Sequence, residues 1–136
     1  MNRVGQKQAA KELLSRKAAR ADLEEFIRYT MPSYEPGPHH GMVIKAVAEA
    51  ASKDNKRLII TLPPRHGKSE IVSVRLPAWY MGKWPTRQII CATYQDDFAV
   101  DFGRMVRGCV QSDEFSKLFP SVKLSADSKA ADRWST

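Results

Sequence analysis

Cysteine, acidic residues and long apolar runs are all scarce in this sequence. The chain of 136 residues has two cysteines, Cys91 and Cys109, and neither belongs to a paired metal-binding spacing. No apolar run approaches the roughly 18 residues that a membrane-spanning helix needs, and the N-terminus lacks the apolar block of a secretory signal. We therefore expect an intracellular protein without a membrane partner, whose cysteines are buried thiols on a strand and on the apolar face of a helix.

The shortage of acidic residues leaves a net charge of +7, with 22 lysines and arginines against 15 aspartates and glutamates. This excess predicts an anionic partner, either a nucleotide or a nucleic acid. The basic residues are spread along the chain at Lys11, Arg16, Lys17, Arg20, Arg75, Lys83, Arg87, Arg104 and Arg107. Ordinary solvated faces and a DNA-facing surface explain this distribution equally well.

The length and the apolar content of 43% suit one compact domain. Residues 1–21 are polar and basic, and they predict either a mobile arm or a docking helix ahead of a domain that spans 22–136. Asp22 and Glu25 resemble a capping box and predict the start of a short helix.

Residues 57–70, with the sequence RLIITLPPRHGKSE, are the most informative segment. The apolar, β-branched residues 58–60 predict a buried strand, which Pro63 and Pro64 must end. Gly67, Lys68 and Ser69 follow immediately before an apolar helical pattern with Glu70 in its first turn. The segment thus predicts strand, loop and helix in that order.

This arrangement suits the binding of a polyphosphate. Backbone N–H groups at a helix start attract anions, glycine permits close approach, Lys68 would reach the β- and γ-phosphates, and Ser69 would bind Mg²⁺. The usual GxxxxGK[ST] pattern has a first glycine, and Leu62 stands in its place here. The alternative is a chance Gly-Lys-Ser in a surface turn.

A second buried strand is predicted at 87–93, and a short edge strand at 122–124. Strand, helix and strand in this order favour a right-handed crossover with parallel pairing. The predicted fold class is therefore α/β, a P-loop NTPase-like three-layer fold with a partial parallel sheet flanked by helices and a helical N-terminal extension. Pro77 should kink or end the helix after Ser69. A helix at 98–110 should bury a stripe that includes Phe98 and Met105.

His39 and His40 precede a predicted helix at 42–51, and their different directions make a shared metal improbable. Capping or packing explains them. A sharper hypothesis places Tyr34 or His40 against an adenine ring. Thr93 or Gln95, after the second strand, could touch the site or a DNA backbone, and the alternative is helix capping by Asp96.

Several segments together resemble the large terminase subunit of tailed bacteriophages. They are PGPHH at 36–40, the run 58–70 with its PPRHGKSE, ATY at 92–94, DFGR at 101–104, FP at 119–120 and DRWST at 132–136. The likeness runs from about Asp22 to the last residue, and the Pro-Pro-Arg-x-Gly-Lys-Ser loop is its most specific part.

The resemblance implies an ATPase that drives double-stranded DNA into a procapsid, in the host cytoplasm and transiently at the portal. It implies ATP and Mg²⁺ as cofactors, with the portal, the small terminase subunit and further copies of the chain as partners. Lys68 and Arg65 take catalytic roles and Ser69 binds the metal. The nucleotide contacts are Pro64, Arg65, His66, Gly67, Lys68, Ser69 and Glu70, with Tyr34 and His40.

The family's acidic Mg²⁺-binding strand, its water-orienting glutamate and its nuclease domain would lie beyond Thr136. We therefore expect weak nucleotide binding and poor hydrolysis by this chain. A helicase-like P-loop ATPase and a non-catalytic interaction module are the alternative functions, and a nucleotide kinase is disfavoured by the Pro-Pro-Arg segment and the basic composition.

Overall fold

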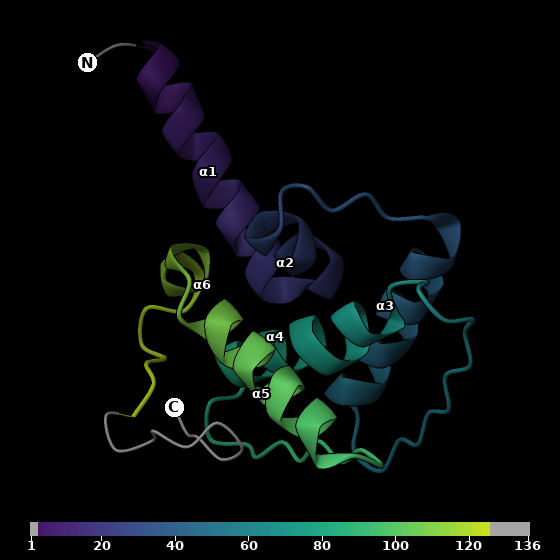
Figure 1. Cartoon of the computed structure of the whole chain (residues 1–136). Helices are drawn as coiled ribbons and strands as arrows, with labels where there is room; N and C mark the ends of the chain where they lie inside the picture. The colour runs from purple at the N-terminus through teal and green to yellow at the C-terminus, as the bar shows by residue number, and fades with distance from the viewer. Residues whose placement is uncertain (1–2, 126–136) are drawn as a thin grey trace.

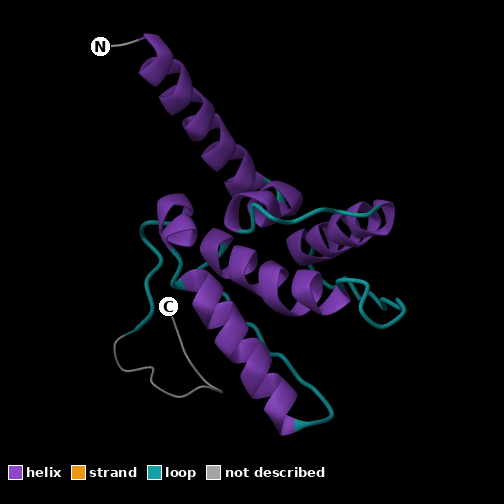
Figure 2. Cartoon of the chain, turned by 45° about the horizontal axis from the view of Figure 1, so that its top comes forward, coloured by secondary structure: helices purple, strands orange, loops and turns teal. Residues whose placement is uncertain are grey.

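The computed structural model describes residues 3–125, and within that range it is a bundle of helices joined by loops (Figure 2). The elements are α1 (Arg3–Ala21), α2 (Leu23–Thr30), α3 (Pro38–Ser52), the π-helical segment η1 (Glu70–Arg75), α4 (Leu76–Lys83), α5 (Asp96–Val110) and α6 (Asp113–Leu118). No strand or sheet occurs among the described residues. The predicted three-layer α/β fold with a parallel sheet is therefore wrong. The DRWST segment at 132–136 lies outside the described residues.

All three predicted strands are wrong because their apolar side chains find no sheet partner. Residues 57–63 and 88–93 run without regular secondary structure, as do 122–125. Ile59 and Ile90 are each 91% exposed, and Leu58 is 46% exposed. A buried strand needs ladder hydrogen bonds and covered faces, and a local apolar pattern supplies neither. Val122 is buried, but it packs as part of the helical core rather than on a sheet edge.

Helix α1 projects from the rest of the protein, and its C-terminal part packs on α2 and α6 (Figure 1). The Tyr29 hydroxyl donates to Glu12 Oε1 at 2.6 Å, and Arg16 Nε donates to the same oxygen at 2.8 Å. These two hydrogen bonds lower the pKa of Glu12, and the bond from Tyr29 has the larger effect. None of the described helices combines the length and apolar character needed to cross a membrane.

The core forms where α2 meets its neighbouring helices. Asp22 caps α2 as predicted, since its Oδ1 accepts from the N–H groups of Glu24 and Glu25 at 2.9 and 3.1 Å. Phe26 is fully buried and meets the Phe115 ring edge to face, with the ring centroids 6.3 Å apart. The largest fully buried side chains are Trp79, Phe26, Phe115, Leu23, Ile27, Ile71 and Leu118.

The helix that follows the Gly-Lys-Ser segment continues past Pro77. Lys68 and Ser69 are helical, and the wider π-helical turns of η1 lead directly into α4. Proline lacks an N–H group and its ring crowds the carbonyl four residues earlier, so the change of helix type just before Pro77 accommodates it. Arg75 closes this segment with a salt bridge to Glu70 at 2.7 Å.

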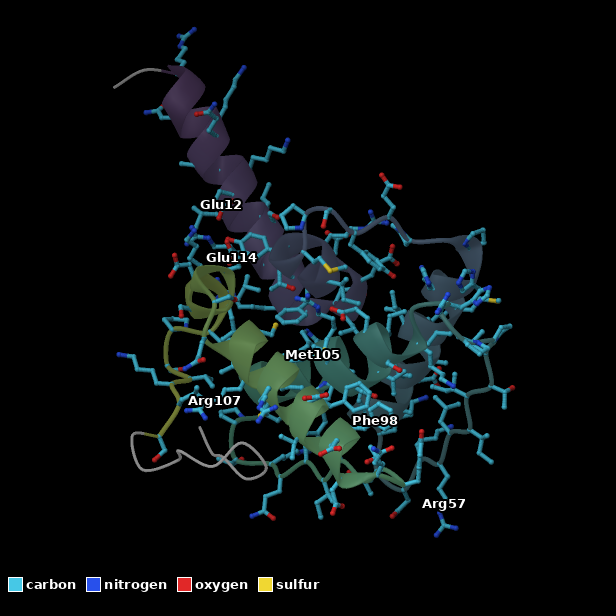
Figure 3. The ribbon with its side chains drawn as sticks, viewed as in Figure 1. Glu12, Arg57, Phe98, Met105, Arg107 and Glu114 are labelled. Atoms are coloured by element: carbon cyan, nitrogen blue, oxygen red, sulfur yellow. The ribbon has the colours of Figure 1, made fainter. Side chains whose placement is uncertain are left out.

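Helix α5 begins at Asp96, and its apolar stripe is only partly core. Phe98 is 41% exposed and Met105 is 47% exposed on the side of α5 that faces the viewer in Figure 3. The buried residues lie toward the C-terminal end, at Val106, Cys109 and Val110. Gln95 rather than Asp96 holds the N-cap position, without a side-chain hydrogen bond, so the predicted capping role of Asp96 is wrong.

Candidate phosphate-binding loop

Residues 64–67 form a turn that leads directly into the continuous helix of residues 68–83, which contains η1 and α4. Arg65 and Gly67 both have positive φ angles, 64° and 74°. Such left-handed residues are typical of loops whose N–H groups converge on an anion. The Ile71 N–H donates to the Gly67 carbonyl at 3.1 Å, which closes the first turn of the helix. The preceding first-turn N–H groups have no carbonyl within the helix to bind, and the helix dipole adds partial positive charge there.

Two cations of this loop, Arg65 and Lys68, form no salt bridge within residues 3–125. Arg65 is exposed and Lys68 is partly exposed, and Ser69 is an exposed residue of the first helical turn. Cations beside a helix N-terminus make an arrangement that can hold a phosphate.

Glu70 is the acidic residue nearest to the loop in sequence, and Arg75 neutralises it. Arg75 Nε donates to Glu70 Oε1 at 2.7 Å, and the Arg75 side chain is only 14% exposed. Arg75 Nη1 also donates to Thr30 Oγ1 at 3.1 Å. The Glu70 carboxylate is thus held by Arg75. Its contact with a nucleotide stays a prediction.

Two histidines of α3, His39 and His40, lie next to His66 of the loop. Figure 1 shows the loop returning to the N-terminal end of α3, where His40 Nε2 lies 3.0 Å from the His66 carbonyl. His40 Nδ1 accepts from the Gly37 N–H at 2.9 Å, which confirms the capping interpretation for His40. His66 Nδ1 in turn lies 2.8 Å from the carbonyl of Pro64.

Tyr34 lies beside this group, with its ring centroid 5.8 Å from that of His40. Its hydroxyl is buried and has no hydrogen-bond partner among the described residues. Burial raises the pKa of Tyr34. The structure brings Tyr34, His40 and the loop together, and adenine contact by either side chain stays a prediction. Thr93 donates to the carbonyl of Gln95 in the turn before α5.

Residues 63–69 offer one side-chain oxygen to a metal ion, the Ser69 hydroxyl. No group of three or more His, Cys, Asp or Glu side chains within residues 3–125 could hold a metal. Mg²⁺ commonly binds through phosphate oxygens and water with one or two protein ligands. Here the Ser69 hydroxyl would supply the protein ligand. Asp101, on the exposed face of α5, pairs with Arg104 at 3.3 Å.

A separate hollow of about 460 Å³ opens beside η1 and α5. Arg75 lines it together with Glu70 and Cys109. Because the Arg75 guanidinium is already bound by Glu70 and Thr30, this hollow offers no free charge to a ligand.

Comparison with protein-family models, with curated proteins and with solved structures finds no match for this chain. The structure also reveals what sequence reasoning missed, namely that His40 connects α3 to the loop across 26 positions. One of the two contacts of His40, the cap of α3, has a signal in the spacing Gly37-Pro38-x-His40. Proline favours the first helical position, and the side chain at the third position can accept from the N-cap amide. Nothing in the sequence signals the other contact, between His40 and the carbonyl of His66.

Proposed function

We propose that residues 63–69 bind the phosphates of ATP. The observation that carries the proposal is the Gly-Lys-Ser segment at the start of the continuous helix of residues 68–83, with positive φ at Arg65 and Gly67 and with two cations, Arg65 and Lys68, that form no salt bridge with any described residue. The backbone amides and Lys68 would share the charge of the β- and γ-phosphates. Arg65 would lie beside the outer phosphate, and Ser69 would hold Mg²⁺.

We further propose that the chain is the ATP-binding part of a DNA-packaging motor of the terminase large-subunit type. The order of segments that resembles that family supports this class, with the Pro-Pro-Arg-His-Gly-Lys-Ser loop as its most specific part. The net charge of +7 supports double-stranded DNA as a partner. Assembly with the portal, the small subunit and further copies belongs to the same proposal.

Hydrolysis by this chain should be poor. Phosphoryl transfer to water depends on positioning, and a carboxylate or amide usually orients the attacking water. Asp96 and Asp97 lie exposed in the first turn of α5, and Asp101 is paired with Arg104. Among the described residues, no hydrogen bond or salt bridge joins any of these three carboxylates to the loop.

Binding of a fluorescent ATP analogue tests the proposal. Because Lys68 would make a charge-assisted contact worth about 1.5–3 kcal/mol, Lys68→Ala should weaken affinity by about tenfold to a hundredfold. Lys45→Ala removes an exposed lysine on α3 and should leave the affinity unchanged. Equal affinity of wild type and Lys68→Ala would contradict phosphate binding by this loop. Rapid steady ATP turnover that Lys68→Ala abolishes would contradict the expectation of poor hydrolysis.

An interaction module without catalysis is the second candidate function. The high exposure of two large apolar side chains, Ile59 and Ile90, on the extended segments favours it, because burial of such side chains against a partner would be favourable. In that case ATP would not raise the melting temperature, and Lys68→Ala would leave partner binding unchanged.

A further inference from the structure

The imidazole of His40 uses both of its nitrogens to bind backbone groups. Nδ1 accepts from the Gly37 N–H at 2.9 Å, so Nδ1 carries no proton. In a neutral ring the proton is then on Nε2, which donates to the His66 carbonyl at 3.0 Å. The two contacts therefore define one tautomer and one ring orientation. They also connect the first turn of α3 to the loop.

The His66 carbonyl belongs to the peptide unit that carries the Gly67 N–H. In a trans peptide the C=O and the N–H point in opposite directions. When His40 holds the carbonyl oxygen on the α3 side, the Gly67 N–H must point to the other side of that peptide. The next carbonyl, that of Gly67, is turned into the helix by the Ile71 N–H at 3.1 Å. Two oxygens that would repel a phosphate are thereby engaged by the protein.

The close approach of His40 also explains why glycine stands at position 67. A Cβ atom there would lie 2.7 Å from His40 Nε2, and φ is +74°. A side chain at this position would force His40 to move, and it would have to adopt a backbone angle that residues other than glycine rarely adopt. The neighbouring His39 differs, since its Nε2 is buried and has no hydrogen-bond partner among the described residues.

We propose that His40 is a positioning residue that orients the 66–67 peptide so that the Gly67 amide faces the nucleotide phosphates. This inference rests on the proposed function of the loop. In this role His40 contacts the backbone of the loop and does not contact the nucleotide. The aromatic groups that face it are Tyr34, with ring centroids 5.8 Å apart, and His39, with ring centroids 4.1 Å apart.

Two conservative variants separate the two contacts of the ring. In His40→Gln the side-chain amide can replace the Nε2 donor toward His66 but not the Nδ1 acceptor. In His40→Asn the shorter side chain can replace the Nδ1 acceptor toward Gly37 but cannot reach His66. If orientation of the loop peptide is what matters, His40→Asn should bind the ATP analogue about threefold to tenfold more weakly than wild type, the range expected for loss of one hydrogen bond. His40→Gln should bind the analogue more tightly than His40→Asn. Its melting temperature should nevertheless be lower than that of His40→Asn, because His40→Gln loses the acceptor that caps α3 at Gly37.

His39→Asn is the matched control, because it changes the adjacent histidine of the same helix turn. It should leave the affinity for the analogue unchanged. Affinities that follow melting temperature, with His40→Gln weaker than His40→Asn, would overturn the positioning role and leave only a capping role.

A second measurement distinguishes this inference from the function on which it rests. The amide resonance of Gly67 in a nitrogen-15 NMR spectrum, recorded without nucleotide, should shift in His40→Asn and stay near its wild-type position in His39→Asn. If wild type fails to bind the analogue, the proposed function fails while this spectrum still tests the orientation of the peptide. If wild type binds, Lys68→Ala does not, and His40→Asn binds like wild type, the function stands and the inference falls.

Discussion

At the scale of single residues, the two cysteines are in opposite environments. Cys91 is exposed on an extended segment, so its predicted burial on a strand is wrong, whereas the predicted burial of Cys109 is confirmed. Burial raises the pKa of the Cys109 thiol, and the nearby Arg75 guanidinium, 3.6 Å from Sγ, only partly offsets this. Because the thiolate is the reactive form, Cys109 has both less access to reagents and less thiolate than an exposed cysteine.

A thiol-reactive chromogenic reagent should therefore modify one cysteine first. At pH 8 we expect Cys91 to react at least about tenfold faster than Cys109, and Cys91→Ser should remove the fast phase. In denaturant the two thiols should react at similar rates. A slow phase that survives in Cys109→Ser, with no fast phase, would contradict the exposure of Cys91.

At the scale of elements, α1 concentrates the positive charge of the chain on a helix whose N-terminal part extends away from the core (Figure 1). It carries six basic residues against one acidic residue, Glu12, which is bound by Arg16 and Tyr29. Lys7 and Lys11 are exposed and lie one turn apart on the same face. A helix of this kind can contact successive phosphates of a duplex, and it is the described element best suited to the proposed DNA partner.

The double variant Lys7→Glu and Lys11→Glu should weaken binding to duplex DNA and make it less sensitive to salt. Each lost phosphate contact lowers the slope of log affinity against log salt by about 0.9, so two contacts lower it by about 2. Lys45→Glu with Lys56→Glu makes the same change in net charge on α3 and the following loop, and it is the control. Equal losses in both double variants would indicate a general charge effect rather than a contact by α1.

At the scale of the whole molecule, helix-on-helix packing supplies the core, and the extended segments lie outside it. Phe26→Ala should lower the free energy of unfolding by about 3–5 kcal/mol, because it opens a cavity between the rings of Phe115 and Phe119. Ile59→Ser and Ile90→Ser should each change it by less than about 0.5 kcal/mol, since both side chains are 91% exposed. Urea denaturation followed by circular dichroism measures all three. A loss at Ile59 as large as that at Phe26 would mean that the extended segment is buried.

The short-range patterns of the sequence were sufficient for several parts of this protein. Asp22 predicts its own helix start, since a cap needs only the next two or three amides. Gly67, Lys68 and Ser69 predict a turn followed by a helix, and the structure has both. In each case the responsible contacts lie within about one helical turn.

Only the tertiary structure decided the features that depend on a distant partner. The β-branched residues near 59 and 90 favour extended backbone, but whether an extended segment becomes a strand depends on a neighbour that can share its hydrogen bonds. His40 reaches the carbonyl of His66 because the chain returns to the start of α3, and Arg75 reaches Thr30 for the same kind of reason. Local preference is encoded in neighbouring residues, whereas these contacts form only when packing brings remote segments together.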